Sequence, residues 1–288
     1  MATDATSTAF GDLRGPRKVL AHGALIAFGF AMLYPVLWMF GSSLKETSDI
    51  FTEISFWPDP VVLDNYSRGW RGIGIPFSRY FINSTIVAVL SVLGNLFAAS
   101  LAGYAFARLE FRWRSVWFAL MLVTIMLPYH VVMVPQYILF TNLGWVNTFL
   151  PLVVPKFLAV DAFFIFLMVQ FIRGLPRDLD HAAMVDGAGP WQVYWRIILP
   201  LTIPALATTA IFTFIWTWND FLTPLIYLND PQLHTVPLGL NAFIDATGES
   251  AWGPMFAMAT LSLGPVLGFF LAGQRYLTEG IATSGIKT

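Results

Sequence analysis

The chain contains no cysteine, and only 11% of its 288 residues are charged. Without thiols it can form no disulfide bridge, thiolate metal site or thiol redox centre. An ordinary soluble domain has about 25% charged residues, so this chain has too few to cover a soluble surface. Its hydrophobic content of 57% excludes intrinsic disorder, and its net charge of −1 gives no general attraction to nucleic acid.

Motifs of the common enzyme classes are also absent. The sequence has no G-x-x-x-x-G-K-[ST] phosphate loop, no H-E-x-x-H zinc helix and no G-x-S-x-G nucleophile turn. Its four histidines lie on separate segments without the spacing of metal ligands. We therefore expect no catalytic residue, no metal site and no cofactor bound by this chain itself.

Six long apolar segments dominate the sequence. Together they contain three charged residues, Lys156, Asp161 and Asp220. A helix of about 20 residues crosses the hydrocarbon core of a membrane, and each segment reaches that length, whereas barrel strands would be shorter and would alternate apolar with polar residues. The sequence therefore predicts an all-α membrane protein with six transmembrane helices. The predicted spans are residues 20–40, 80–106, 116–140, 150–172, 197–228 and 251–273.

Basic residues are distributed unevenly between the two sides that six spans define. Most of them lie on the side that carries both termini, and the connections 141–149 and 229–250 contain no Lys or Arg. Because basic residues favour the cytoplasmic side, we expect both termini in the cytoplasm. The predicted organisation is a cytoplasmic tail over 1–19, a six-helix domain over 20–276 with an outer loop over 41–79 and an inner coupling loop over 173–196, and a cytoplasmic tail over 277–288.

The inner connection 173–196 has the pattern of two short helices separated by a turn. Asp178 and Asp180 suit the start of the first helix, where acidic groups complement the helix dipole. Gly187 breaks this helix, and Pro190 then takes a first-turn position in the second one, which continues into the fifth predicted span. The first helix also contains a pair of alanines, whose small side chains allow another protein to approach closely.

A known sequence pattern lies in this connection. It reads His181-Ala182-Ala183-x-x-Asp186-Gly187-Ala188, followed by Ile198-Leu199-Pro200. It resembles the EAA loop of ABC importer permeases. Further motifs resemble the sugar-importer permeases of the maltose-permease type, and the resemblance runs from around residue 20 to the end of the chain. Those motifs are Asp64-Asn65-Tyr66, Pro128 with Pro135-x-Tyr137, Leu143-Gly144 with Asn147-Thr148, Trp218-Asn219-Asp220-Phe221 and Gln274-Arg275-Tyr276…Gly280.

The resemblance implies the type I ABC importer permease architecture in the cytoplasmic (inner) membrane of a bacterium or archaeon. Such a permease pairs with a second homologous permease. An ATPase dimer, which binds ATP and Mg²⁺, docks on the inner helices and drives alternating access. An extracytoplasmic binding protein or lipoprotein delivers the substrate, here a carbohydrate. The resemblance assigns coupling to the ATPase to Asp180, His181, Ala182, Ala183, Asp186, Gly187, Ala188 and Pro200.

One position departs from the family pattern. The family has a glutamate at the head of the motif, where this chain has His181, and Asp180 stands one residue earlier. The polar contact to the ATPase is therefore altered, moved to Asp180, or sensitive to protonation.

Polar and aromatic residues inside two predicted spans are candidates for the substrate path. Pro128 and Pro135 free backbone carbonyl groups and should kink the third span. Polar side chains nearby either satisfy those carbonyls or line a pathway. Asp220 either caps the fifth span at the membrane interface or accepts hydrogen bonds from a sugar, because ionisable groups inside membranes usually face a cavity or a partner. The candidates are Tyr129, His130, Gln136, Tyr137, Trp216, Trp218, Asn219 and Asp220.

The charged residues of the fourth predicted span, Lys156 and Asp161, are five positions apart. Residues that face each other on one helix are three or four apart, so we expect no ion pair and expect Lys156 to extend toward the interface. Two other functions remain open. A permease for another solute, such as a glycerol phosphate, would favour basic residues in the path. A stand-alone secondary transporter would leave the EAA-like loop unexplained, and the sequence shows no inverted repeat.

Overall fold

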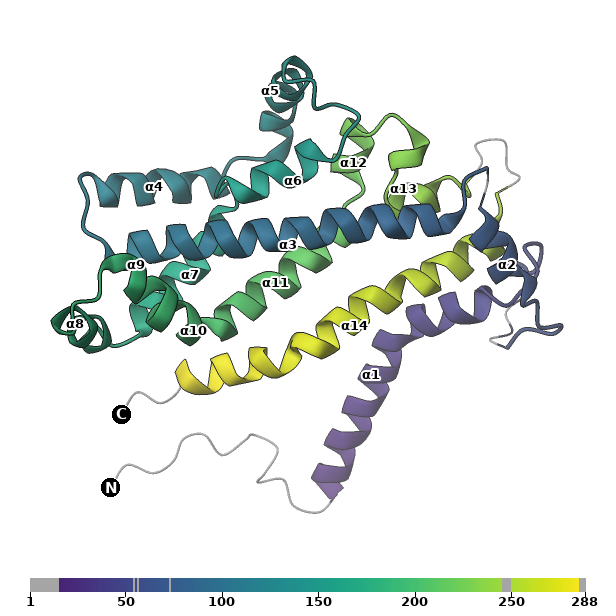
Figure 1. The fold of residues 1–288 in the computed structure, drawn as a ribbon. Helices are drawn as coiled ribbons and strands as arrows, with labels where there is room; N and C mark the ends of the chain where they lie inside the picture. Colours follow the sequence, from purple (N-terminus) through teal and green to yellow (C-terminus); the bar gives the residue numbers. More distant parts are fainter. Residues whose placement is uncertain (1–15, 54, 56, 73, 245–249, 285–288) are drawn as a thin grey trace.

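The structure, a computed structural model, describes residues 16–284 apart from 54, 56, 73 and 245–249. Every regular element in these ranges is a helix, which confirms the all-α class (Figure 1). Of the predicted tails, 1–15 and 285–288 lie outside the described residues. The elements are α1 Pro16–Ser42, α2 Asp64–Arg71, α3 Phe77–Arg108, α4 Arg114–Ile125, α5 Tyr129–Asn142, α6 Leu150–Phe157, α7 Ala162–Gly174, α8 Asp178–Val185, α9 Pro190–Val193, η1 Tyr194–Ile198, α10 Leu199–Leu201, α11 Ile203–Trp218, α12 Leu222–Tyr227, η2 Pro231–Leu233, α13 Val236–Asn241 and α14 Trp252–Ser284.

The described helices provide four to six segments long and apolar enough to cross a membrane. Four segments qualify on their own: Lys18–Ser42, Phe77–Arg108, Leu150–Gly174 and Trp252–Tyr276. Two bent pairs, Arg114–Ile125 with Tyr129–Asn142 and Pro190–Leu201 with Ile203–Trp218, qualify when each pair counts as one span. Counted in that way, they agree in number and order with the six predicted spans, but the fifth runs from Pro190 to Trp218 rather than over 197–228. The orientation of the termini stays a prediction.

The long helix α3 is the central element. It runs for 32 residues and packs against α6, α7 and α11, and α11 in turn packs against α14. Glycines allow two of these contacts to be close. A Cβ atom at Gly94 would lie 2.7 Å from the ring of Phe157 in α6, and one at Gly103 would lie 2.6 Å from the Cβ of Met168 in α7. Small residues at such contacts are a general device of helix packing in membranes.

The inner connection and the long outer loop lie at opposite ends of α3. Figure 1 shows α8 and α9 near the Arg108 end and α2 near the Phe77 end. At the outer end Asn83 donates hydrogen bonds to the backbone oxygens of Gln232 at 2.8 Å and His234 at 2.9 Å. The fold therefore separates the two loops by the full length of its longest central helix.

Within the outer loop, helix α2 packs onto α14. Buried Asn65 in α2 donates to the backbone oxygens of Ser43 at 3.0 Å and Lys45 at 2.7 Å. The side chain of Lys45 is buried too and donates to the backbone oxygen of Ser55 at 2.6 Å. Gly253 in α14 leaves the space that Asn65 occupies. The loop is thus held by satisfied buried polar groups, as interiors require.

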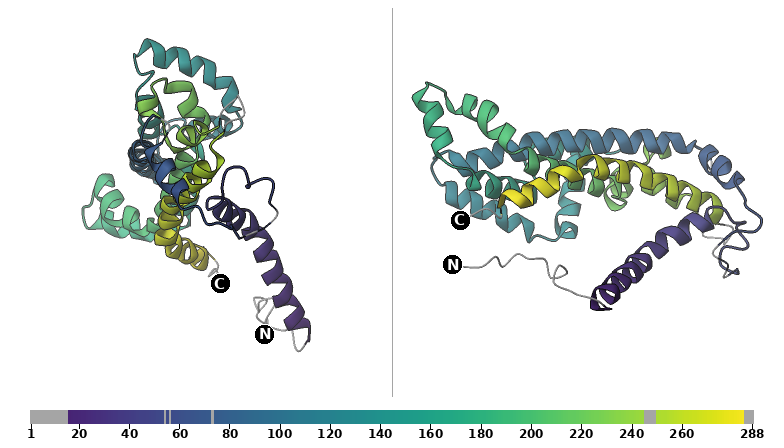
Figure 2. Two further views of the ribbon diagram at one scale, coloured as in Figure 1. Left: turned by 90° about the vertical axis from the view of Figure 1, so that its right-hand side faces the viewer. Right: turned by 90° about the horizontal axis from the view of Figure 1, so that it is seen from below.

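The first helix, α1, has little contact with the rest of the chain. None of its most apolar 18-residue window is buried. Its C-terminal part packs on α14, and its N-terminal part points away from the other helices (Figure 2). A helix that is apolar all round is buried in a core or spans a membrane, so this one requires lipid or another protein around it.

The third predicted span is sharply bent. Helices α4 and α5 meet at an angle of 102°. Pro128 explains the bend, because the residue before a proline avoids the helical region. Pro135, which we also expected to kink the span, lies inside α5.

The fifth predicted span is divided into pieces. A π-helical turn, η1, precedes a 73° bend between Pro190–Leu201 and Ile203–Trp218. Pro200 and Pro204 account for both features, because a proline lacks the N–H that a helix needs and crowds the carbonyl four residues earlier. The span stops again at Trp218 before α12 begins.

Candidate functional site

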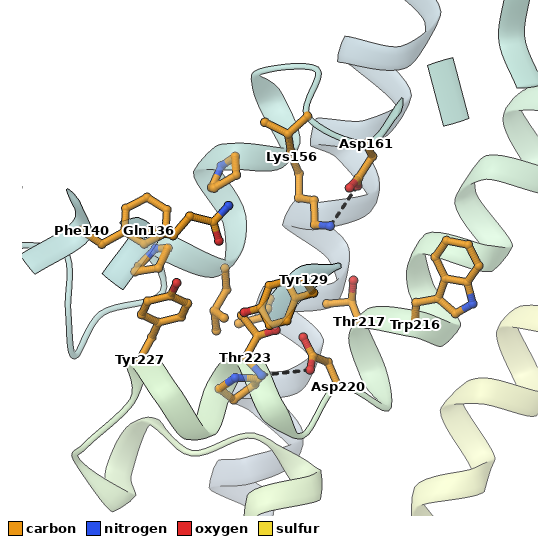
Figure 3. A pocket seen from close by; sticks show the side chains of 16 residues that line it. Tyr129, Gln136, Phe140, Lys156, Asp161, Trp216, Thr217, Asp220, Thr223 and Tyr227 are labelled. Atoms are coloured by element: carbon orange, nitrogen blue, oxygen red, sulfur yellow. Dashed lines mark hydrogen bonds and ion pairs between the residues drawn. The ribbon is translucent and has the colours of Figure 1, made fainter. Parts of the chain in front are cut away.

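A cavity of about 370 Å³ opens between α5, α6, α11 and α12, with α3 behind it. It combines aromatic rings, hydroxyl and amide groups, and charged side chains (Figure 3). The labelled lining residues are Tyr129, Gln136, Phe140, Lys156, Asp161, Trp216, Thr217, Asp220, Thr223 and Tyr227. Ligand sites are typically concave and apolar with a few convergent polar groups, and this cavity has that composition.

Lys156 and Asp161 form an ion pair in the cavity wall, so the expectation that they would not pair is wrong. The distance from Lys156 Nζ to Asp161 Oδ2 is 2.9 Å, and the side chains are 29% and 26% exposed. The helix α6 ends at Phe157, Ala159 adopts a φ of 57°, and Asp161 directly precedes α7. Because the helix breaks between the two residues, the spacing rule for one continuous helix does not apply.

Asn95 of α3 supports this ion pair from behind the cavity. Its Nδ2 donates to Asp161 Oδ2 at 2.7 Å and to Thr213 Oγ1 on α11 at 3.0 Å. The residue is 3% exposed. Sequence reasoning missed Asn95, although an amide in the middle of an apolar segment is a typical signal of an interhelical hydrogen bond.

Asp220 lies in the break between α11 and α12. Its Oδ1 accepts a hydrogen bond from the backbone N–H of Thr223 at 3.1 Å. Figure 3 shows Asp220 among the side chains that line the cavity. Among the described residues, no Lys or Arg forms an ion pair with this carboxylate. Asp220 therefore caps a short helix and also faces the cavity.

Half of the predicted path residues line the cavity. These are Tyr129, Gln136, Trp216 and Asp220. The others, which do not line it, are His130, Tyr137, Trp218 and Asn219. Trp218 is 2% exposed and donates from Nε1 to the backbone oxygen of Ser262 at 3.2 Å, so it belongs to the core. Tyr137 stacks on the lining residue Tyr227, with ring centroids 6.1 Å apart.

Sequence reasoning missed further lining residues, namely Thr217, Thr223 and Tyr227. The two threonines lie three residues before and after Asp220 in the sequence. That symmetry was an available signal, but it is informative only once the helix is known to break between them.

The coupling-loop residues form a second site, at the Arg108 end of α3. Of the predicted set, His181, Ala182, Asp186, Gly187 and Pro200 are exposed, Ala188 is half-buried and Ala183 is buried. Gly187 ends the first short helix with a φ of 82°, a value that favours glycine. The adjacent Val185 is 87% exposed.

Asp180 differs from its neighbours because its side chain points into the protein. Its Oδ2 lies 2.7 Å from Nε of Arg108 on α3, and the two side chains are 11% and 5% exposed. His181, by contrast, is exposed. No group of three or more His, Asp or Glu side chains in the described ranges is arranged to hold a metal ion.

Comparisons with known proteins show the family to which this chain is similar. The family described as "binding-protein-dependent transport system inner membrane component" matches residues 94–282. The chain is similar to the probable ABC transporter permease protein YurM of Bacillus subtilis, with 34% identity over 264 residues that cover 91% of this chain and 86% of YurM. It is 30% identical to the diacetylchitobiose uptake system permease protein NgcG of Streptomyces coelicolor over 264 residues, covering 91% of this chain and 87% of NgcG.

A solved structure shares the fold. It is a chain of a bacterial ABC transporter involved in the import of the acidic polysaccharide alginate. The two chains superpose with a TM-score of 0.79 and 21% sequence identity, covering 92% of this chain and 99% of the other.

Proposed function

The chain belongs to the family of binding-protein-dependent transport system inner membrane components and is a multi-pass permease subunit of an ABC importer, and we propose that its cargo is a sugar or oligosaccharide. The cavity carries this proposal. Aromatic rings of Tyr129, Trp216 and Tyr227 stand beside the hydrogen-bonding groups of Gln136 and Asp220. Flat aromatic faces combined with polar groups suit a sugar ring, which is apolar on its faces and rich in hydroxyl groups at its edges.

The charges in the cavity favour a carbohydrate over a glycerol phosphate. Lys156 is the basic residue of the lining, and its charge is compensated by Asp161 at 2.9 Å. Asp220 adds a negative charge without a basic partner among the described residues. A phosphate group in this cavity would therefore meet net negative charge from this chain, whereas neutral hydroxyl groups can donate to Asp220.

We propose the partners that the family resemblance implies. A second homologous permease completes the pathway, and an ATPase dimer that binds ATP and Mg²⁺ contacts the exposed face around His181 and Val185. A binding protein delivers the sugar to the side that carries the outer loop. In this arrangement both termini lie in the cytoplasm, and the complex resides in the cytoplasmic membrane of a bacterium or archaeon.

Reconstitution tests this proposal. The chain is co-expressed with its second permease, ATPase and binding protein, and the complex is inserted into proteoliposomes. We expect ATP-dependent uptake of radiolabelled diacetylchitobiose or maltose and none of sn-glycerol 3-phosphate. The matched control contains this chain alone and should take up nothing. Uptake of the glycerol phosphate but of neither sugar contradicts the carbohydrate assignment, and uptake by the chain alone contradicts the importer assignment.

A further inference from the structure

Polar side chains along one side of α3 hold the inner connection. Ser100, Tyr104 and Arg108 are spaced four residues apart, so they lie on one face of the helix. Ser100 Oγ lies 2.8 Å from the hydroxyl of Tyr194 in η1, and the hydroxyl of Tyr104 donates to the backbone oxygen of Pro190 at 2.9 Å. Helix α9 and the turn η1 that follows it are thus hydrogen-bonded directly to α3.

Arg108 holds α8 against the same face of α3 through an ion pair. Its Nε lies 2.7 Å from Asp180 Oδ2, and its Nη2 donates to the backbone oxygen of Leu175 at 2.9 Å. Both charged side chains are almost fully buried. Separating a buried ion pair leaves an uncompensated charge, so this contact resists displacement of α8 away from α3.

The covalent connections lead from α8 to the cavity in two directions. Toward the N-terminus, α7 runs back to Asp161, which lines the cavity; toward the C-terminus, the chain passes through the π-helical turn η1 and the 73° bend before α11. Helix α3 adds a third route that needs no covalent link to α8, since it is continuous from Phe77 to Arg108. Five residues beyond Ser100 it carries Asn95, which holds Asp161 and through it the cavity residue Lys156.

We propose that Arg108 and Asp180 are a positioning pair that makes α8 and α3 move as one body. Movement of α8 by the ATPase then reaches the cavity through α3, by way of Asn95, as well as through the covalent connections along α7 and α11. The hydrogen bond from the Tyr104 hydroxyl to the backbone oxygen of Pro190 adds to this attachment at α9. This inference rests on the proposed function, since it requires an ATPase that displaces α8.

The test uses the natural absence of cysteine. Thr223, which lines the cavity, is replaced by cysteine in the full complex, and its reaction with a membrane-impermeant maleimide is timed before and after trapping with Mg-ATP and orthovanadate. In the otherwise unmodified complex we expect trapping to change the rate of labelling of Thr223→Cys, because alternating access changes exposure of the cavity. The vanadate-trapped nucleotide is measured in the same sample, so closure of the ATPases is known independently. No transported substrate is needed.

The variant Arg108→Gln with Asp180→Asn removes both charges, so no buried charge is left unpaired. We expect trapped nucleotide to persist while the trapping-dependent change in labelling falls about fivefold or more, in the usual range of coupling between sites. Tyr104→Phe keeps the ring, removes one hydrogen bond and should give a smaller loss. Arg112→Gln is the matched control, because it removes an exposed positive charge four residues further along and should leave the labelling change intact.

The outcomes separate this inference from the proposed function. If trapping leaves the labelling of Thr223→Cys unchanged in the unmodified complex, the importer mechanism itself fails. If the double variant assembles, traps nucleotide and keeps the full labelling change, the positioning role of the pair is wrong. If the double variant does not assemble, Tyr104→Phe decides in the same way, since a full labelling change in that variant overturns the route through α3.

Discussion

Asn95 and Asp161 lie 2.7 Å apart in the interior, where an amide of α3 donates to the carboxylate that precedes α7. Lys156 donates to the same carboxylate oxygen at 2.9 Å. The carboxylate therefore has two donors from two different helices. Because a partly buried charge is tolerated when it is paired and hydrogen-bonded, this arrangement explains how an acidic residue is kept beside the cavity.

Replacing Asn95 with alanine should destabilise the subunit. The change removes donors to Asp161 and Thr213 together, and loss of hydrogen bonds to a charged group costs about 1.5–3 kcal/mol. Thermal unfolding of the detergent-solubilised complex measures the effect. Asn219→Ala is the control, because Asn219 is exposed and bonds only to Ile215 of its own helix among the described residues. Equal shifts for the two variants would argue against the buried network.

Asp220→Asn should reduce uptake and leave assembly intact. The amide has nearly the same shape and keeps an oxygen for the N–H of Thr223, but it offers a sugar hydroxyl a weaker acceptor. A loss of about 1.4 kcal/mol corresponds to a tenfold lower affinity, and we expect uptake to fall by about that factor while basal ATP hydrolysis persists. Glu46→Gln, at an exposed site outside the cavity, is the control. Unimpaired uptake by Asp220→Asn removes Asp220 from the substrate path, and failed assembly indicates a cationic partner on the second permease.

Gly187→Ala should weaken attachment of the ATPase. No atom lies within 4 Å of a Cβ placed at Gly187, so the change causes no clash within the chain. The φ of 82° is unfavourable for alanine by about 1–2 kcal/mol, and relief of this strain would shift the end of α8. Co-purification of the ATPase measures the result. Gly189→Ala is the matched control, since Gly189 has equal space and a φ of −74°; an equal loss in both variants contradicts the backbone explanation.

Trp57→Ala should weaken docking of the binding protein without unfolding the subunit. The side chain of Trp57 is 65% exposed, whereas Trp70 is 45% exposed and packs on Phe81 with ring centroids 5.8 Å apart. Exposed tryptophans are frequent anchors of interfaces, with losses of about 2 kcal/mol or more on truncation. Binding of the purified binding protein to immobilised complex gives the affinity. Arg71→Ala, exposed in the same loop, should change it little, and similar effects of both would mean that the loop only connects helices.

Acidification should destabilise the loop around His234. Burial lowers the pKa of His234 below its ordinary value, and this effect outweighs the opposing influence of the Leu228 backbone and of Asp230. The folded loop therefore takes up a proton less readily than the unfolded loop, so its stability falls as the pH drops below about 6.5. Hydrogen exchange of residues 229–236, corrected for intrinsic rates, should increase on acidification. The variant His234→Asn should show no such increase; if it does, another group is responsible.

The sequence was sufficient for features that depend on local composition. Apolar runs located the spans, and Asp178 and Gly187 marked the ends of α8. Pro128 marked the bend before α5. These predictions succeed because length, helix capping and proline geometry act within a few residues of their cause.

The composition of the cavity could be predicted only in part, because it depends on helix breaks that tertiary contacts determine. The break at 158–161 has no proline within it, and Ala159 takes its positive φ where Asp161 reaches Asn95. Spacing rules for a continuous helix therefore do not hold across such a break. Lys156 was expected to extend outward, whereas it pairs with Asp161 on the other side of the break.

The isolation of α1 has an evolutionary consequence. Because none of the apolar window of this helix is buried against its own chain, shape complementarity within the subunit constrains its side chains mainly where its C-terminal part packs on α14. Exchanges among Leu, Ile, Val and Phe there should be nearly neutral for folding of the subunit, whereas Gly94 and Gly103 in α3 admit no larger residue without displacing a neighbour. Sequence divergence between related permeases should thus accumulate faster along α1 than along α3, limited by hydropathy rather than by volume.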